Sequence, residues 1–276
     1  MGYKTILVHC DASASVHHRL DVAANLAERF GAHLVGLHVR RPFETPFFFD
    51  GGFPMDDFFK SYEASVKADE AVALAAFTKS AKGRHLATEW RVAEGYIEGE
   101  TAVQARYADL IVLGQAEQEP TATPSDLPES VALVTGRPVL VVPHIGAKPP
   151  GKIVMLCWNA SREAARAATD ALPLLKAAEK VIVLAINPKA SAAGHGAEPG
   201  ADAAAWLARH GVKVSVQRDV ALDVDVGGVI LSRAADHGVD LIVMGIYGQS
   251  RMREMVLGGA SRTLLGSMTV PVFMAH

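Results

Sequence analysis

The second half of this chain repeats the first, and a repeat of this length predicts two copies of one domain. Three stretches recur in the same order. The matched pairs are KTILVHCDAS (residues 4–13) with KIVMLCWNAS (152–161), ADLIVLG (108–114) with VDLIVMG (239–245), and PVLVV (138–142) with PVFMA (271–275). A proline-rich joint, Lys148–Gly151, separates the copies and has the composition of an exposed linker. We therefore predict one domain over residues 1–147 and a second over residues 151–276.

Strands and helices alternate within each copy. The runs LIVL (residues 110–113) and LIVM (241–244) are apolar throughout, which is typical of parallel strands covered by helices on both faces. A helix with apolar residues at helical spacing follows the first strand, and Gly31 is its expected C-cap. The pattern predicts an α/β fold of two tandem, doubly wound domains. The expected strands are 5–10, 33–39, 86–92, 110–113, 139–142, 181–186, 212–216, 241–244 and 272–274, with helices near 57–82, 96–107 and 127–135.

The composition of the chain limits the classes of partner that we expect it to bind. The formal net charge is −3, so no excess of Lys and Arg favours nucleic acid. No apolar run approaches the roughly 20 residues that span a bilayer, and the N-terminus lacks the apolar segment of a signal peptide. The two cysteines, Cys10 and Cys157, fall in expected core strands and make a disulfide framework improbable. These features predict a cytoplasmic protein with no membrane partner.

The loop after the fourth strand of the second copy carries the candidate binding site. It reads GIYG from Gly245, then nine residues, then GGASR from Gly258. Glycines let backbone N–H groups approach a phosphate, and a helix that starts near Gly259 offers unpaired donors and a positive dipole end. Arg251 and Arg253 add positive charge. The alternative is a tight turn and a helix start without any ligand.

Two other phosphate motifs are excluded. A Walker-type loop needs Gly-Lys-Ser or Gly-Lys-Thr, and neither triplet occurs. A dinucleotide fingerprint needs glycines after the first strand, where this chain has Asp11-Ala12-Ser13 or Asn159-Ala160-Ser161.

The spacing Gly245-x2-Gly248-x9-Gly258, between an LIVMG strand and a final strand led by Pro-Val, resembles the universal stress protein family over nearly the whole chain. The resemblance implies five parallel strands in each copy, a universal stress protein-like and adenine nucleotide alpha hydrolase-like fold. It also implies that ATP, with or without Mg, is the ligand. In ATP-binding members the glycines and a following hydroxyl hold the phosphates, and an acidic residue after the first strand approaches the nucleoside.

Carried over by this resemblance, the glycine positions fit, whereas Gly259 replaces the hydroxyl residue and Asn159 replaces the acidic one. Ser261, two residues later, is a candidate substitute for the hydroxyl. The nucleotide-binding residues that the resemblance implies are Asn159, Met244, Gly245, Gly248, Gly258, Gly259, Ala260 and Ser261.

The first copy departs from the family pattern in the opposite way. Asp11 keeps the acidic residue, but Glu117 replaces the second glycine and Glu119 follows. Carboxylates near a phosphate repel it by roughly 1–4 kcal/mol at about 4 Å. We therefore predict that the first copy does not hold ATP phosphates and acts as a structural partner of the second.

An aromatic insertion, Pro42–Phe53, follows the second strand of the first copy, with Phe58 and Phe59 just beyond it. It is interpreted as a packing or oligomer contact, with a lid over a cleft or an apolar ligand site as alternatives. The eleven histidines show no metal-site spacing, and no nucleophile motif occurs. The sequence therefore predicts neither a metal site nor a catalytic residue.

The favoured function is a stress-response module that binds an adenine nucleotide and is not an enzyme. The alternatives are a nucleotide-independent interaction protein or scaffold, a binder of an apolar ligand, and, with least support, a slow ATP hydrolase. The two closing strands, residues 139–142 and 272–274, are expected to pair within the chain, because a bare apolar edge strand seeks a partner. Association of whole chains into a dimer or larger homo-oligomer is left open.

Overall fold

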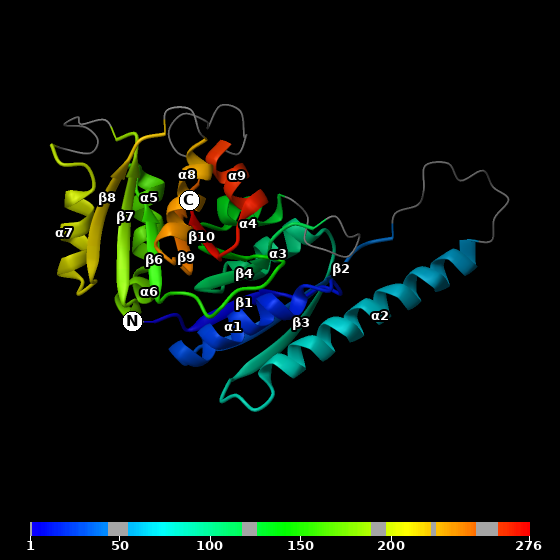
Figure 1. The fold of residues 1–276 in the computed structure, drawn as a ribbon. Coiled ribbons are helices and arrows are strands. Elements are labelled where there is room, and N and C mark those ends of the chain that lie inside the picture. Colours follow the sequence, from blue (N-terminus) through cyan, green and yellow to red (C-terminus); the bar gives the residue numbers. More distant parts are fainter. Residues whose placement is uncertain (1, 44–54, 118–125, 189–196, 222–224, 247–258) are drawn as a thin grey trace.

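The computed structural model describes residues 2–43, 55–117, 126–188, 197–221, 225–246 and 259–276. Over these residues ten strands form one sheet in the order β3-β2-β1-β4-β5-β10-β9-β6-β7-β8 (Figure 1). The strands are β1 (Thr5–His9), β2 (His33–Arg40), β3 (Thr88–Glu94), β4 (Leu110–Gly114), β5 (Val139–Val142), β6 (Ile153–Cys157), β7 (Lys180–Ile186), β8 (Val214–Asp219), β9 (Leu241–Gly245) and β10 (Val272–Ala275).

Helices cover both faces of this sheet. The described helices are α1 (Val16–Phe30), α2 (Met55–Ala81), α3 (Ile97–Ala105), α4 (Leu127–Thr135), α5 (Arg162–Asp170), α6 (Leu172–Ala177), α7 (Ala201–Arg209), α8 (Val226–Asp236) and α9 (Gly259–Ser267). Buried residues of α1, α2, α5, α6 and α7 belong to one apolar core, and those of α3, α4, α8 and α9 belong to a second core on the other face. The predicted α/β fold with two tandem domains is confirmed.

The two halves join through their closing strands. Within each half the strand pairs are parallel, whereas β10 pairs with β5 antiparallel, with Phe273 opposite Leu140. Both cores therefore run through the junction without a break: one contains Leu140 and Phe273, and the other contains Val141 and Val272.

Helix caps follow the sequence signals. Gly31 adopts a left-handed conformation (φ 61°) that an L side chain rarely tolerates, and it ends α1 as expected. Ser161 caps α5 by accepting a hydrogen bond from the N–H of Ala164 at 3.1 Å. The α5 and α6 helices are separate, and Pro173 lies in the first turn of α6.

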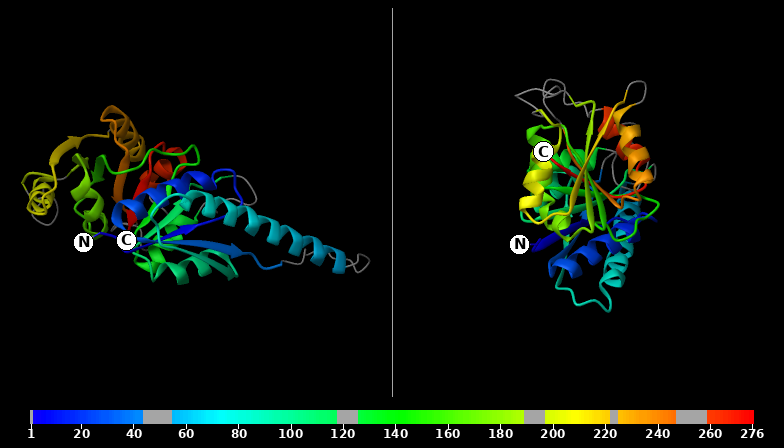
Figure 2. Two further views of the ribbon diagram at one scale, coloured as in Figure 1. Left: turned by 90° about the horizontal axis from the view of Figure 1, so that it is seen from below. Right: turned by 60° about the vertical axis from the view of Figure 1, so that its left-hand side comes forward.

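The joint between the halves differs from the exposed linker that its prolines predicted. Lys148 and Pro149 are exposed, but Pro150 and Gly151 are buried. The Arg29 side chain donates to the carbonyl of Pro150 at 3.1 Å, and the Asp240 carboxylate accepts from the N–H of Gly151 at 2.7 Å. The helix that follows the second strand of each copy differs in length between the copies: α2 spans 27 residues, whereas α7 spans 9. Helix α2 extends well beyond the sheet (Figure 2).

Candidate functional site

The strand order brings two loops together in each half. In the second half β6 lies between β9 and β7, so the chain leaves β6 toward β7 on one side and β9 toward β10 on the other. This is a topological switch point, where open parallel sheets bind ligands beyond the carboxyl ends of the strands. The loops after β6 and β9 therefore border the same edge, and β1 and β4 repeat the arrangement in the first half.

Asn159 stands at the start of the loop after β6. Its side chain is exposed, and Oδ1 accepts a hydrogen bond from the N–H of Ser161 at 3.1 Å. Ala160 between them has a positive φ of 56°. The tight turn places Ser161 as the cap of α5, so Asn159 shapes the helix start while its amide faces solvent.

Met244 and Gly245 end β9 against the start of α5. Met244 is buried, and a Cβ added to Gly245 would lie 2.4 Å from the carbonyl carbon of Glu163 and 2.5 Å from the nitrogen of Ala164. These are backbone atoms that cannot move aside without shifting the helix. Gly245 is therefore required for the close approach of β9 to α5.

Helix α9 begins at Gly259, where the sequence placed a helix start. Gly259 is exposed, Ala260 is half-buried and Ser261 is buried. The first N–H groups of such a helix are donors, and the dipole makes this end positive. Helix α8 packs closely here, since a Cβ at Gly227 would lie 2.6 Å from the carbonyl oxygen of Ala260.

Two carboxylates at helix starts border these residues. Asp225 caps α8 by accepting from the N–H of Gly227 at 3.0 Å, and a Cβ at Gly259 would lie 3.7 Å from its Oδ1. Glu163 is buried at the start of α5; its Oε1 accepts from Arg162 at 3.1 Å, and its Oε2 has no hydrogen-bond partner in the described part of the chain. Burial acts to raise the pKa of Glu163, but hydrogen bonds from its own backbone N–H, Ser161 and Arg162 outweigh burial and lower it.

The structure thus brings Asn159, Met244, Gly245, Gly259, Ala260 and Ser261 to the ends of β6 and β9 and the start of α9. The predicted site residues Gly248 and Gly258, together with Arg251 and Arg253, lie outside the described residues.

In the first half, the acidic residue after β1 is engaged within the protein. Asp11 is buried and forms an ion pair with Arg19, whose side chain is only 1% exposed. The Ser13 hydroxyl and N–H also donate to Asp11, at 2.5 and 3.0 Å. Burial acts to raise the pKa of Asp11, but Arg19, His9 and the Ser13 hydrogen bonds outweigh it and hold the pKa below its usual value.

Glu117, which replaces a family glycine, reaches back to the start of α1 and accepts a hydrogen bond from Ser15. Nearby, Gln115 crosses to the other half and donates to the carbonyl of Leu265 at 2.8 Å. The loop after β4 therefore places a carboxylate at the positive end of α1, where an anionic ligand would otherwise be attracted.

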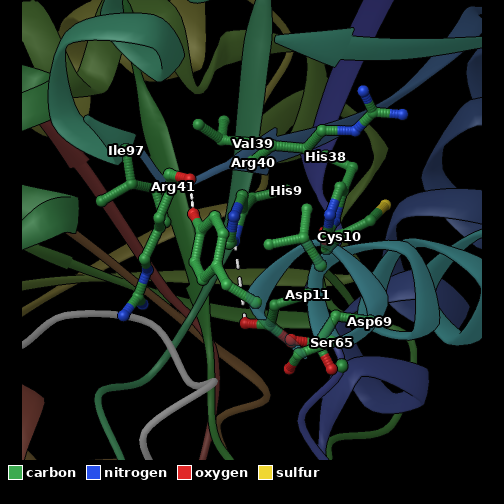
Figure 3. A pocket seen from close by; sticks show the side chains of 13 residues that line it. His9, Cys10, Asp11, His38, Val39, Arg40, Arg41, Ser65, Asp69 and Ile97 are labelled. Atoms are coloured by element: carbon green, nitrogen blue, oxygen red, sulfur yellow. Dashed lines mark hydrogen bonds and ion pairs between the residues drawn. The ribbon is translucent and has the colours of Figure 1, made fainter. Parts of the chain in front are cut away.

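A pocket of about 140 Å3 lies at the carboxyl ends of β1 and β2, beneath α2 (Figure 3). The sequence marks this pocket only by two histidines, His9 and His38, which lie near the carboxyl ends of the neighbouring strands β1 and β2. It is lined by His9, Cys10, Asp11, Ala12, His38, Val39, Arg40, Arg41, Tyr62, Ser65, Val66, Asp69 and Ile97.

Comparisons with known proteins agree with this fold. The model of the universal stress protein family matches residues 2–143 and again residues 151–276, so the chain belongs to that family. A universal stress protein from Archaeoglobus fulgidus DSM 4304 is 15% identical with a TM-score of 0.71, over 98% of this chain and 95% of that one. A functionally unknown protein from Pseudomonas aeruginosa PAO1 is 14% identical with a TM-score of 0.59, over 99% and 92%. No curated protein matched the sequence.

Proposed function

We propose that this universal stress protein family member is a stress-response binding module that holds ATP or a related adenine nucleotide in its C-terminal half and does not catalyse a reaction. The observation that carries the proposal is the start of α9: an exposed Gly259, followed by Ala260 and the buried Ser261, next to the switch point. Backbone donors at a helix start attract phosphate oxygens without any catalytic side chain.

The carboxylates nearby favour a metal complex of the nucleotide over the free anion. Asp225 lies beside Gly259, so free triphosphate at the start of α9 would meet a negative group, and the Glu163 carboxylate is buried at the start of α5. A divalent cation such as Mg²⁺ reduces this repulsion, and it is commonly held by one or two carboxylates together with the phosphates. Asp225, and Glu163 through its unpartnered Oε2, are the residues that would hold such an ion.

The first test identifies what the protein carries. Purified protein is denatured and the released small molecules are analysed by mass spectrometry; ATP or AMP supports the proposal. Thermal stabilisation by Mg-ATP is then measured for wild type, Gly259→Glu and Gly266→Glu. The first substitution places a carboxylate at the start of α9, and the second places it near the end, where a Cβ at Gly266 meets nothing within 4 Å.

We expect Gly259→Glu to lose the stabilisation by Mg-ATP and Gly266→Glu to keep it. Equal shifts in the two variants, or no shift in wild type, would refute the nucleotide site. Phosphate release followed over hours tests the non-enzymatic assignment, and release above the buffer rate would overturn it.

One observation favours the alternative of an apolar ligand. Between α5 and α7 a hollow of about 340 Å3 is walled by Trp158 and Trp206, with small residues between them. A fatty acid or another apolar molecule in the mass spectrum, in place of a nucleotide, would support this reading.

The free cysteines Cys10 and Cys157 fit the proposed cytoplasmic location.

A further inference from the structure

The pocket of the N-terminal half has unsatisfied polar atoms at its floor. His9 and Asp11 are 2% and 6% exposed, and both line the pocket. His9 Nδ1 and Asp11 Oδ2 lie 3.8 Å apart, too far for a hydrogen bond, and neither has another hydrogen-bond partner among the described residues. Figure 3 shows the two side chains directed toward each other at the carboxyl end of β1.

The charge states of these two groups limit what can bind them. Burial lowers the pKa of His9 to about 3, so its imidazole is neutral at physiological pH. Asp11 is ionised and held by Arg19. A ligand oxygen between them can accept from a protonated Nδ1 of His9 and donate to Oδ2 of Asp11, which a hydroxyl does and an anionic oxygen does not. An anion would also be repelled by the Asp11 carboxylate.

The walls of the pocket are largely apolar and lead to aromatic rings. Val39, Val66 and Ile97 line the pocket itself. A neighbouring hollow of about 390 Å3 shares Arg40, Arg41, Tyr62 and Val66 with it and adds Phe43 and Phe59. The ring of Phe43 lies 5.1 Å from that of Phe59 and 5.1 Å from that of Tyr62.

Four charged side chains that line the hollow, Arg40, Glu94, Lys67 and Glu63, form ion pairs within the protein. Arg40 pairs with Glu70 at 2.5 Å and with Glu94 at 3.1 Å, and Lys67 lies 3.8 Å from Glu63. These pairs weaken the attraction for a charged ligand, whereas the tilted and edge-on rings of Phe43, Phe59 and Tyr62 form an aromatic surface that favours a flat aromatic one.

From these contacts we propose that the N-terminal half binds a small, uncharged aromatic molecule that carries a hydroxyl group. The hydroxyl lies between His9 and Asp11, and the ring system runs along Val66 and Tyr62 toward Phe43 and Phe59. This site lies in the N-terminal half, whereas the proposed nucleotide site lies in the C-terminal half. An experiment can therefore refute one proposal without refuting the other.

The probe is 2-naphthol, titrated into the full chain by calorimetry, with 2-methoxynaphthalene as the analogue that cannot donate and 2-naphthoate as the anion. We expect one 2-naphthol per chain. Loss of the donor leaves buried polar groups unpaired, so binding of the methyl ether weakens at least ~10-fold, as does binding of the anion.

Two variants on one helix locate the site. Val66→Trp fills the pocket and should abolish binding, whereas Val72→Trp, at a position that is 51% exposed, should leave it unchanged. Thermal unfolding checks that both variants fold. The proposal is overturned if 2-naphthol does not bind, if the methyl ether binds equally well, if Val66→Trp binds like wild type, or if ATP displaces the probe.

Discussion

At the residue scale, one buried ion pair organises the first half. Arg19 donates from Nε to the carbonyl of His9 at 2.8 Å and pairs with Asp11, so it fixes the end of β1 and the start of the following loop. Arg19 and Ser13 thereby hold Oδ1 of Asp11 within the fold, which leaves only Oδ2 of this acidic residue to contact a ligand.

Arg19→Met keeps the apolar stem and removes the charge. Because it leaves the Asp11 carboxylate buried without its partner, we expect unfolding free energy to fall by about 3–5 kcal/mol. Arg166→Met is the matched control, since its pair with Asp170 is partly exposed and contributes about 1 kcal/mol or less. Urea unfolding measures both. A loss of under ~1 kcal/mol for Arg19→Met would contradict the central role of the pair.

His9 makes the protein sensitive to acid. Its pKa is about 3 in the folded chain against 6.5 for an ordinary histidine, because burial disfavours the charged ring. The unfolded chain therefore binds a proton as pH falls below about 6.5 while the folded chain does not, and stability is lost across that range by up to about 1.4 kcal/mol per pH unit. The lowered pKa of Asp11 adds a loss only in more acidic solution, below the ordinary carboxyl value.

His9→Gln isolates this contribution. Urea unfolding of wild type and variant is compared from neutral pH down to about pH 5, where His9 titrates only in the unfolded chain. We expect the wild-type stability to fall more steeply than that of the variant, and parallel curves would show that His9 is not the source. His18, whose pKa is also lowered, is present in both proteins and cancels from the difference.

At the element scale, the start of α5 is packed against the end of β9. Gly245→Ala would bring a Cβ to 2.4 Å from the Glu163 backbone, so strand and helix must separate. We expect a loss of roughly 1–3 kcal/mol in unfolding free energy. Gly259→Ala serves as the control, because its Cβ would make an ordinary 3.7 Å contact with Asp225. Equal stability of the two variants in urea unfolding would show that β9 and α5 are not in tight contact.

Much of this element pattern could be predicted because local signals and tertiary burial agree. The strand at residues 139–142 and the helix at 127–135 have the predicted bounds, and others shift by a few residues. In each repeat an aspartate leads the fourth strand: Asp109 accepts from the N–H of Thr5 at 3.0 Å, and Asp240 accepts from that of Ile153 at 3.2 Å. The repeated residues thus hold together repeated strands.

The candidate sites were harder to predict because they depend on contacts between distant segments. In the sequence, Asp11 is an ordinary loop residue and Arg19 an ordinary helix residue, and nothing there indicates that the two form a buried ion pair. The floor of the N-terminal pocket combines His9 with α2, and nothing in the sequence around either indicates that they meet. In the second half, the resemblance to the family indicated the loop after β9 as the site. The packing of Asp225 beside Gly259 could not be predicted, because it depends on how α8 and α9 are placed.

At the scale of the whole molecule, the antiparallel pairing of β5 with β10 turns two repeats into one sheet with shared cores. The buried half of the joint, held by Arg29 and Asp240, strengthens the connection. None of the described helices has the length and apolar character to cross a membrane.

A continuous core predicts that the halves unfold together. Two variants each keep a single tryptophan: Trp90 reports on the first half and Trp206 on the second, with the other tryptophans replaced by Phe. We expect coincident urea transitions. Phe273→Ala, at a fully buried position opposite Leu140, should lower the stability seen by both reporters equally, by about 3–5 kcal/mol. Two separate midpoints, or a shift confined to Trp206, would mean that the sheet is continuous in geometry while each half remains an independent folding unit.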